Sequence, residues 1–495
     1  MSQPIYSTSV QIPAFSGINQ TGDGYNRNMQ YAWEMENVNV EGGSFRQMRE
    51  GLLVPQELSK PIGTLACLHR RYGTETGTLL VAISDGEVYT KVLDGSDAWV
   101  KRYPGTGQTK LTVSDCDWLT YEVNERAGQT LANPVDVLFF TNAKDGMFCL
   151  YGDTKEVVHV QVTTDPEERP NEDIKFGVIA RYNERIWGAG IEGDPDKLMY
   201  STPYDPFNWQ MNSEIPEDGA GDILQPSWDG DKFVALRQFG DNLLAVKTNS
   251  IWRIYGTDPS SFTMAQQYGS GTIVENTLAV FNDRAYMLGH NGMMIYDGTG
   301  VYAFNQEAVR ILFGEKVNYS AIDKACAWMR DRTYCLALPI NGSSYCNAVL
   351  EYNTSEQTLS LRTEVSVDSF LQVDSRLFYT SATEPGRVFE MQDKIGKTIP
   401  CKWISCWQDL GLKNSIKSAF VLYMMVDSEA PVELRVGIRT EKKLKQKTIN
   451  TKPGKMTRLH LNLQGREFRL EIQSYSSVPF TISGGIRIDL ELDPD

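Results

Sequence analysis

The sequence predicts an all-β protein, a β-propeller of about seven blades with an N-terminal extended arm and a C-terminal β-sandwich. Three observations predict this architecture. Hairpin-like pairs of strands recur along the chain, their spacing is similar throughout, and the residues after 395 differ from the rest in charge and in strand length. We expect the arm and one hairpin over 1–60, the propeller over 61–395 and the sandwich over 396–495.

The recurring unit is a mostly apolar strand, a turn of Gly, Asn or Asp, and a second strand that ends in or near an aromatic residue. In the first unit, Leu79–Ile83 is followed by the turn Ser84-Asp85-Gly86 and then by Val88-Tyr89. Asn-Gly and Asp-Gly turns between such runs are strong hairpin signals, because their positive φ angles match the twist of the strands. The seven units span 79–89, 137–151, 185–200, 242–255, 284–296, 332–352 and 376–389.

The spacing of these units favours a propeller. Equivalent positions in successive units lie 41 to 59 residues apart, and a period of that size built from hairpins is typical of four-stranded blades. A second repeated phrase, an apolar strand followed by a two-residue polar turn, occurs at 179–185, 234–242 and 278–284. Six or eight blades are also compatible with the spacing, and two β-sandwiches are the alternative arrangement.

Two elements interrupt or precede the repeats. A short helix is expected between blades, with Asn305 as N-cap, Glu307–Phe313 as its body and Gly314 as its C-terminal stop. The first 60 residues contain one hairpin, over 37–48 about a Gly-Gly turn, between polar stretches. The remainder of that segment is therefore expected to be an extended arm.

The residues from 396 onward have a different character. They contain 16 Lys and Arg against 11 Asp and Glu, a net charge of +5, whereas residues 1–395 carry −20. Five longer strands with short loops predict a separate β-sandwich, joined at a boundary near Lys394–Pro400. The expected strands are Ala419–Val426, Val432–Arg439, Met456–Leu463, Glu467–Ile472 and Gly485–Leu490.

The composition excludes several classes of protein. The chain has 495 residues with 11% aromatic and 22% charged residues, so general disorder is excluded. A net charge of −15 argues against a general nucleic-acid binder. The longest apolar run is Ala419–Val426, too short for a membrane span, and no secretory signal is visible, so we expect a soluble protein made in the cytoplasm. The eight cysteines are isolated or wrongly spaced for a zinc site, which predicts reduced, buried thiols.

No motif for chemistry is found. The sequence contains neither Gly-x-Ser-x-Gly nor His-Glu-x-x-His. The four histidines are too scattered to propose a metal cluster, so no enzyme activity, metal or cofactor is expected; they are His69, His159, His290 and His460. Four tryptophans are candidates for stacking on sugars, although blade cores also explain them; they are Trp187, Trp209, Trp252 and Trp328.

One strong charge feature remains, a cluster of six lysines between Arg439 and Met456. Two interpretations stay open. The cluster is a solvated, highly charged hairpin loop, or it is a contact surface for an acidic neighbouring subunit or for DNA. The six residues are Lys442, Lys443, Lys445, Lys447, Lys452 and Lys455.

Several phrases of the sequence resemble a known family. Residues 36–52, which read ENVNVEGGSFRQMREGL, resemble the opening of phage tail structural proteins, in which a strand and a Gly turn are followed by an Arg-x-Gly-Leu close. The stretches 230–256 and 282–298 are similar to the β-propeller nozzle and tail accessory (packaged-DNA stabilisation) proteins of short-tailed bacteriophages. The resemblance covers about 36–300, and the phrases contain no catalytic residue that carries over.

The resemblance implies a virion protein assembled as a ring, usually of six copies, below the portal and adaptor. Such a ring extends the DNA channel, retains packaged DNA and offers docking surfaces for fibres or spikes. An acidic channel wall suits this role, because DNA must slide past it without binding. We therefore expect carboxylates to face the channel and no sequence-specific DNA contact.

Two other functions are considered. The first is a glycan-binding or glycan-cleaving propeller on a tail or cell surface, because a carboxylate pair on the ring face is invisible to sequence. A glycan array or a hydrolysis assay distinguishes this function from a nozzle. The second is a scaffolding propeller of a cell, which the N-terminal arm and the near-absence of Trp-Asp repeat endings disfavour.

Overall fold

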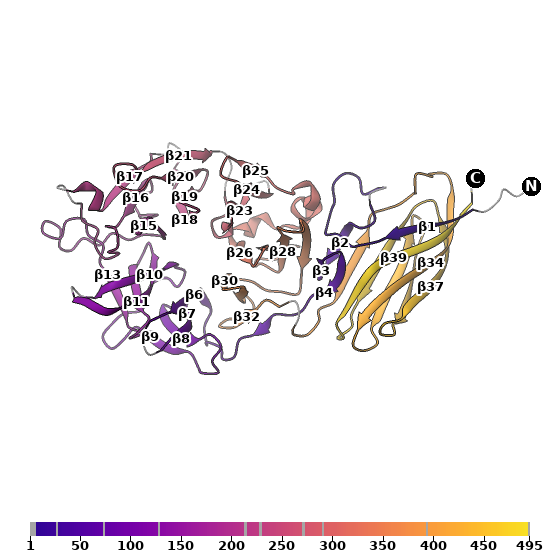
Figure 1. The fold of residues 1–495 in the computed structure, drawn as a ribbon, viewed down its shortest axis with the longest axis horizontal. Coiled ribbons are helices and arrows are strands. Elements are labelled where there is room, and N and C mark those ends of the chain that lie inside the picture. The colour runs from indigo at the N-terminus through magenta and orange to yellow at the C-terminus, as the bar shows by residue number, and fades with distance from the viewer. Residues whose placement is uncertain are drawn as a thin grey trace, which may run out of the picture.

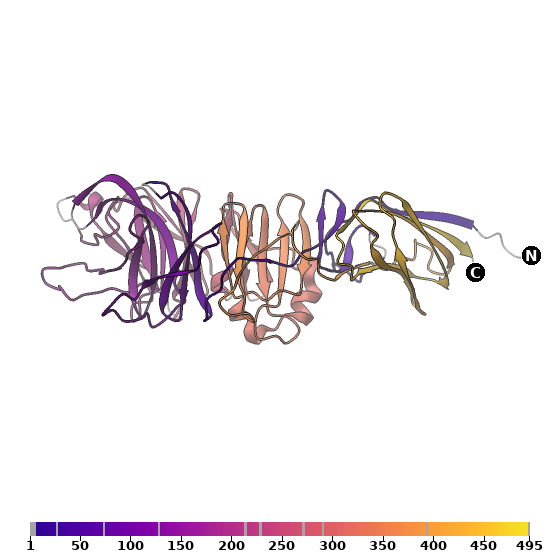
Figure 2. The same ribbon diagram turned by 90° about the horizontal axis from the view of Figure 1, so that it is seen from below.

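The protein is all-β and elongated, with a ring of small sheets at one end and two larger sheets at the other (Figures 1 and 2). The computed structural model describes residues 6–25, 28–72, 75–126, 129–211, 215–226, 230–269, 273–289, 292–392 and 395–493. Within these residues there are seven four-stranded sheets, one six-stranded sheet and one five-stranded sheet. We call the four-stranded sheets the ring and the two larger sheets the terminal body.

Each sheet of the ring is built from strands that are paired antiparallel in order. The first sheet contains β6 (Ile62–Arg70), β7 (Gly77–Ser84), β8 (Glu87–Val92) and β9 (Val100–Tyr103), and the second β10 (Asp117–Arg126), β11 (Gln129–Asn142), β12 (Gly146–Tyr151) and β13 (Val157–Val160). The third contains β14 (Val178–Tyr182), β15 (Arg185–Ala189), β16 (Lys197–Tyr200) and β17 (Gly221–Leu224), and the fourth β18 (Phe233–Phe239), β19 (Asn242–Lys247), β20 (Ile251–Tyr255) and β21 (Thr263–Tyr268). The fifth contains β22 (Ala279–Phe281), β23 (Arg284–Gly289), β24 (Gly292–Tyr296) and β25 (Val301–Ala303), and the sixth β26 (Cys326–Arg330), β27 (Thr333–Leu338), β28 (Ala348–Asn353) and β29 (Thr358–Arg362). The seventh contains β30 (Ser369–Val373), β31 (Arg376–Thr380), β32 (Val388–Glu390) and, from near the N-terminus, β5 (Leu52–Leu53).

The recurring hairpins of the sequence are confirmed. Each forms the second and third strands of one four-stranded sheet. The first turn uses the residues expected, because Asp85 and Gly86 have φ of 52° and 73°. Asn341 and Gly342 also have positive φ, of 54° and 78°, but lie in a longer loop between Leu338 and Ala348. Both residues of such a turn need positive φ to follow the twist of the strands.

The four-stranded sheets close into a ring, which is the arrangement of a β-propeller. The first strand of each sheet contacts the first strand of the next, and β30 contacts β6. The middle strands β12 and β15 are buried along their whole length, as expected for sheets covered on both faces by neighbours. The strand β5 completes the last sheet by pairing with β32, so the ring is closed by a segment that precedes it in the chain.

Tyrosine hydroxyls join neighbouring sheets of the ring. Tyr121 donates to the carbonyl of Glu184 at 2.7 Å, and Tyr182 donates to the carbonyl of Gly256 at 2.7 Å. Tyr334 likewise donates to the carbonyl of Thr277 at 2.9 Å. Each bond satisfies a polar group that apolar packing would otherwise leave without a partner.

The terminal body consists of two sheets that face each other across a hydrophobic core. The six-stranded sheet contains β3 (Val38–Glu41), β4 (Ser44–Gln47), β39 (Phe480–Asp493), β34 (Ile416–Ser428) and β37 (Met456–Gly465), with β1 (Tyr6–Ile12) also paired to β39. The five-stranded sheet contains β2 (Ala32–Glu36), β33 (Cys401–Ser405), β38 (Phe468–Ser474), β35 (Glu433–Thr440) and β36 (Leu444–Asn450). Buried and exposed residues alternate along β37, which is typical of a sheet with one face in a core and one in water.

The expected N-terminal arm is wrong as a description of residues 6–53. The hairpin at 37–48 is confirmed as β3 and β4, but the polar stretches around it also form strands. β1 pairs with β39, β2 pairs with β33 and β5 pairs with β32. The arm expectation failed because the partner strands lie more than 300 residues away, and no local pattern reports such pairing.

The helix expected between blades is present but differs in form. It begins with a 3-10 turn at Glu307–Val309 and continues as a π-helical turn at Leu312–Lys316, so Gly314 lies inside it and does not end it. A third helical segment, 3-10 in type, follows at Tyr319–Lys324, and others occur at Pro216–Asp218 and Glu275–Thr277. Arg310 of the expected helix donates from Nε to the carbonyl of Gln20 at 2.7 Å, and thereby holds the N-terminal segment.

Asn37 joins the ring to the terminal body. It is buried and has a left-handed backbone, with φ of 59°. Its backbone N–H donates to the carbonyl of Leu361 at 2.8 Å, and its Oδ1 accepts the N–H of Thr363 at 2.7 Å. Its Nδ2 donates to Thr363 Oγ1 at 2.9 Å and to the carbonyl of Pro400 at 2.7 Å.

Apolar packing continues across the same joint. Phe15 lies between Phe45 and Trp403, with ring centroids 5.5 and 5.4 Å away. One hydrophobic cluster includes these residues together with Tyr286 and Leu336 of the ring. A joint that is both hydrogen-bonded and apolar leaves little freedom for hinge motion.

We predict that Asn37→Ala lowers the free energy of unfolding by about 3–5 kcal/mol, because it leaves buried groups of Thr363 and Pro400 without partners and strains a left-handed backbone. Asn37→Gly should lose about 1 kcal/mol less, since glycine accepts positive φ. The control is Asn39→Ala on the same hairpin, expected to change stability by no more than about 0.5 kcal/mol. Urea denaturation followed by circular dichroism measures all three, and equal effects of Asn37→Ala and Asn39→Ala would contradict this role.

Candidate interaction surfaces

The six lysines predicted as a cluster lie on and around β36, and the expectation of a hairpin loop is corrected here. β36 pairs with β35 along its length, and in the sheet order it is the last strand. The lysines therefore follow an open sheet edge. Sequence reasoning missed the strand because four lysines within six residues, 442–447, give it the composition of a solvated loop.

The register of β36 separates the lysines into two roles. Lys445 and Lys447 lie opposite Ile438 and Val436, which are fully buried in the core. The Nζ of Lys445 donates to the carbonyl of Asn462 on β37 at 2.8 Å, across the open side of the two sheets. Charged residues that point inward on an edge strand prevent another chain from adding a strand there.

Five of the six lysines, including Lys447 of the inward pair, reach solvent and form a basic surface. Lys442, Lys443, Lys447, Lys452 and Lys455 are exposed. Within the described residues their side chains make no ion pair, and only the Lys445 ammonium is held by a hydrogen bond. We call the exposed lysines, together with Lys445, the basic edge.

A second basic feature lies on the outer face of the six-stranded sheet. Arg458, Tyr423 and Arg487 are direct cross-strand partners, and both guanidinium groups lie over the Tyr423 ring, at 5.5 and 5.6 Å from its centroid. Met425 and Met456 form the next exposed pair along the sheet. No sequence pattern predicted this row, because its members come from three strands and meet only through their register.

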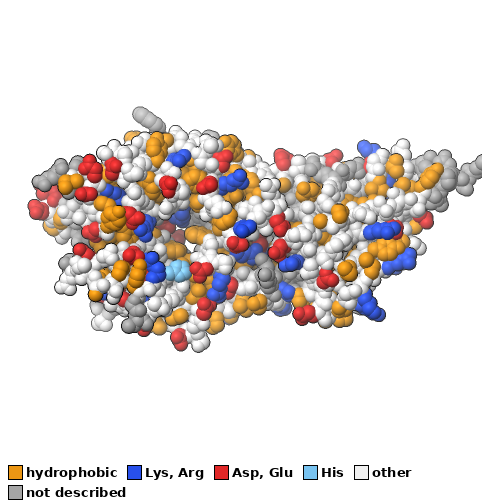
Figure 3. Space-filling model, in the orientation of Figure 1, with side chains coloured by type: hydrophobic (Ala, Val, Ile, Leu, Met, Phe, Trp, Pro, Cys, Tyr) orange, Lys and Arg blue, Asp and Glu red, His pale blue; other side chains and the backbone are white. Residues whose placement is uncertain are grey.

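The opposite end of the molecule is acidic. Between residues 165 and 222 the sequence has 14 Asp and Glu against 5 Lys and Arg. Figure 3 shows Asp and Glu gathered at this end, beyond β13 and β15–β17, and Lys and Arg gathered over β34, β37 and β39 at the other end. We call the exposed residues of 165–224 the acidic end.

Exposed apolar side chains accompany the acidic end. Tyr204 is 74% exposed, Met211 60%, Ile215 51% and Leu224 59%. Around them, Glu167, Glu168, Glu217 and Asp218 are exposed, and no ion pair within the described residues neutralises them. Apolar residues surrounded by one sign of charge are typical of a protein-binding surface.

The axis of the ring contains a cavity of about 330 Å³. Residues in the first strands or just before them line it, among them Asp115, Asp117, Asp368, Trp118 and Trp328. Partial desolvation in the cavity raises the pKa of Asp115, and the carboxylates of Asp368 and Asp117 raise it further, although the side chains of Asp115 and Asp368 remain exposed to solvent. Partial desolvation also raises the pKa of Asp368, while Lys324 opposes this effect.

Arg237 crosses the axis beside this cavity. It extends from β18, and its Nη1 lies 3.4 Å from Asp117 Oδ1 on β10. Its guanidinium also lies 6.0 Å from the ring centroid of Trp328 on β26. Arg237 thereby contacts residues of two other sheets across the cavity.

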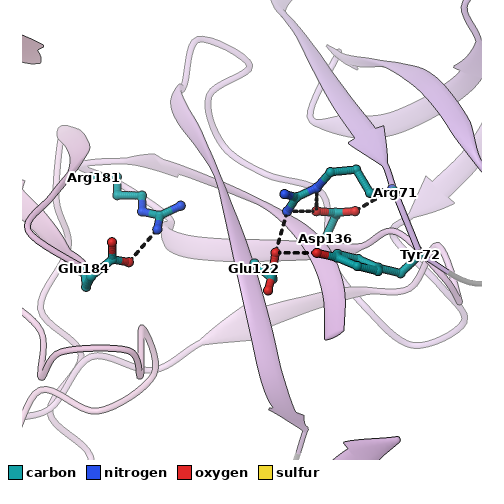
Figure 4. A network of polar contacts seen from close by, with 6 residues as sticks. All are labelled: Arg71, Tyr72, Glu122, Asp136, Arg181 and Glu184. Carbon is teal, nitrogen blue, oxygen red and sulfur yellow. Dashed lines mark hydrogen bonds and ion pairs between the residues drawn. The ribbon is translucent and has the colours of Figure 1, made fainter. Parts of the chain in front are cut away.

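A polar network ties the first sheet to the second (Figure 4). Arg71 donates from Nε to Asp136 Oδ1 at 2.9 Å and from its backbone N–H to Asp136 Oδ2 at 2.6 Å. Its Nη2 also lies 2.7 Å from Glu122, whose carboxylate accepts the Tyr72 hydroxyl at 3.0 Å. These hydrogen bonds to Asp136 raise the pKa of Arg71. Because each charge has a partner of opposite sign, the network is a structural tie.

Two polar hollows flank the joint between ring and terminal body. One, of about 710 Å³, is lined by Glu36, Glu50, Glu364 and Glu384 together with Tyr345. The other, of about 520 Å³, contains both arginines and carboxylates. The salt bridge of Glu50 with Lys397, at 3.0 Å, neutralises part of the first hollow.

The expectations about chemistry have the following outcomes. All eight cysteines are free and buried, and burial raises the pKa of the Cys67 thiol to about 12, so it is protonated at neutral pH. Among the described residues no group of three His, Cys, Asp or Glu is placed to hold a metal ion; His290 lies outside the described residues. Trp187 and Trp209 are buried, while Trp252 and Trp328 are half-buried. In the described part of the chain no helix is both long and apolar enough to span a membrane.

Comparisons with known proteins give structural neighbours only. No family model matches the chain, and no curated protein matches it. BBS1N in complex with ARL6DN is similar with a TM-score of 0.40 and 11% identity, over 70% of this chain and 98% of that one. The Pan2 WD40 domain of Neurospora crassa gives 0.36 and 9%, over 70% and 91%. The extracellular domain of a putative one-component system from B. thetaiotaomicron gives 0.45 and 10%, over 90% of this chain and 63% of that chain.

We predict that Asp115→Asn and Asp368→Asn each stabilise the protein at pH 7. A raised pKa means that folding disfavours the charged carboxylate, so the destabilisation is present above the folded pKa and vanishes as the pH falls below the ordinary value of 3.8. The gain should be about 1 kcal/mol or less, because solvent in the cavity screens the charges, and should disappear at acidic pH. Thermal unfolding between acidic and neutral pH measures it.

The control for this prediction is Asp241→Asn in the exposed turn between β18 and β19. It should leave the pH profile of stability unchanged. If Asp115→Asn and Asp368→Asn both destabilise the protein at pH 7, the prediction is contradicted, and the carboxylates are instead required as hydrogen-bond acceptors.

Proposed function

We propose that the chain is a structural protein of a bacteriophage tail, forming a nozzle or hub ring below the portal and adaptor. In this role it extends the DNA channel, retains packaged DNA and docks fibres or spikes. One observation carries the proposal. The segment 36–52, which resembles the opening of phage tail proteins, contains Asn37 and the hairpin that joins ring and terminal body. The resembling residues are thus the ones on which the shape of this chain depends.

The finer architecture belongs to the same proposal. We take the seven four-stranded sheets as seven blades of one closed propeller, and the two larger sheets as a C-terminal β-sandwich that the N-terminal strands complete. Closure of the last sheet by β5 supports the blade count. The hydrophobic core shared by the two larger sheets supports the sandwich.

The DNA channel in this proposal runs between copies, because the axial cavity of a single chain, about 330 Å³, has the size of a small-ligand pocket and not of a duplex. By resemblance the ring has six copies. A net charge of −15 suits a wall past which DNA slides without sequence-specific binding. Such a protein is made in the host cytoplasm, becomes part of the virion, and needs no enzyme activity, cofactor or membrane.

A second candidate is a glycan-binding or glycan-cleaving propeller, and the axial cavity favours it. Carboxylates and two tryptophans meet in a cavity of about 330 Å³, a size suited to a small ligand. Glycosidases use a pair of carboxylates, of which the general acid has a raised pKa; Asp115 or Asp368, each with a raised pKa, could supply that acid. A glycan array and a hydrolysis assay test it, and binding lost in Asp368→Asn would support it.

We predict that purified phage particles from the source contain this chain as a ring on the tail axis, seen by cryo-electron microscopy and identified by mass spectrometry. A position at the periphery of the tail would contradict the nozzle and favour glycan binding. Absence from the particles would contradict any virion role.

A further inference from the structure

The two charged surfaces of the molecule lie at opposite ends of one rigid body. The basic edge belongs to the five-stranded sheet of the terminal body, which Figure 1 shows at the opposite end of the molecule from β13 and β15–β17, where Figure 3 shows the acidic residues. The joint between them is hydrogen-bonded through Asn37 and apolar around Phe15 and Trp403. The two ends of one chain therefore cannot fold back onto each other.

We propose that copies of this chain associate head to tail, with the basic edge of one copy bound to the acidic end of the next. The inference rests on the proposed ring and names the surfaces that hold it. Because the two surfaces differ, an open assembly of any length still has one free basic edge at one end and one free acidic end at the other. Repetition then gives a closed ring or a filament.

The basic edge is suited to side-chain docking. The inward lysines Lys445 and Lys447 hinder strand addition at β36, so a partner must bind through side chains. A seven-residue strand spans about 23 Å, which distributes the ammonium groups along the side of the terminal body. At one end of this row Lys452 and Lys455 adjoin Met456, which is 62% exposed.

The acidic end offers the complementary surface. Tyr204 and Leu224 are exposed apolar residues, and Glu167, Glu168 and Glu217 supply charges without an ion-pair partner in the described part of the chain. Both surfaces thus combine exposed apolar side chains with charge of one sign, and the signs are opposite. This pattern matches the apolar centre and polar rim of protein interfaces, in which rim charges steer association.

A second copy fits the basic edge better than DNA does. The outer surface of duplex DNA is dominated by phosphates, with little apolar area at the backbone for Met456 or for Tyr475, which is 63% exposed and follows β38 at the same end of the terminal body. The acidic end offers both. Each chain carries one acidic end and one basic edge, so every basic edge has an acidic end available as a partner.

The test is charge reversal of each surface in the full-length chain. One variant carries Lys447→Glu, Lys452→Glu and Lys455→Glu, and the other carries Glu167→Lys, Glu168→Lys and Glu217→Lys. The charge-matched control carries Lys60→Glu, Lys232→Glu and Lys413→Glu, three exposed lysines elsewhere. Analytical ultracentrifugation at low and high salt measures association, and circular dichroism checks folding.

We expect the wild-type chain and the control to associate at low salt and to dissociate at high salt. Each reversed variant alone should associate at least tenfold more weakly, because like charges then face each other. An equimolar mixture of the two reversed variants, or one chain carrying both sets, should recover association, since opposite charges meet again. A general loss of folding cannot produce this recovery.

Other outcomes overturn the proposal. A wild-type chain that stays monomeric at low salt would do so, as would reversed variants that associate like the wild type. Tight binding of labelled duplex DNA by the basic edge without self-association would instead assign this surface to DNA.

Cross-linking mass spectrometry of purified particles separates this inference from the proposed function. Cross-links between copies that join Lys442–Lys455 to residues 165–224 would support the head-to-tail contact. An axial ring without such cross-links would support the proposed nozzle function and contradict the proposed head-to-tail contact. Absence of the chain from particles would contradict the nozzle function. Restored association in the mixture of the two charge-reversed variants would still support the head-to-tail contact.

Discussion

The structure depends on the hydrogen bonds of Asn37. Through one left-handed residue, the N-terminal segment reaches β29 of the ring and Pro400 at the start of the terminal body. Every donor and acceptor of this buried side chain is used, and the aromatic packing of Phe15 surrounds the joint with apolar contacts. Because the joint combines these hydrogen bonds with continuous apolar packing, we expect ring and terminal body to move as one unit. The charges at the two ends of the molecule are consequently held apart.

The way in which the edge strands are paired or protected links this fold to its proposed role. The ring has no free end, because β5 pairs with β32. The terminal body leaves β36 as an open edge, and its inward lysines disfavour strand addition. Partners are therefore expected to bind through side chains at the two ends. This is the behaviour that an assembly component requires, since uncontrolled edge pairing would lead to aggregation in place of a closed ring.

Sequence reasoning succeeded where structure is decided locally. Turns such as Asp85-Gly86 favour hairpins by their own φ angles, and all seven hairpins were predicted. It failed where partners are distant, because the pairing of β1 with β39 leaves no local signal and those residues were expected to form an arm. The lysines of β36 were found as a cluster, but their strand was not, since its stability comes from pairing with β35. The row of Arg458, Tyr423 and Arg487 and the axial carboxylates depend on register and ring closure, which no single stretch of sequence records.

The most direct test of this account asks whether the N-terminal segment is held by its contacts alone. A protease recognition sequence inserted between the exposed residues Ser59 and Lys60 allows the folded chain to be cut after β5. The account predicts that residues 1–59 remain bound under native conditions and co-elute with the remainder, because β1, β2, β4 and β5 all pair with strands beyond residue 387. Separation of the fragment by size-exclusion chromatography without denaturant would contradict it.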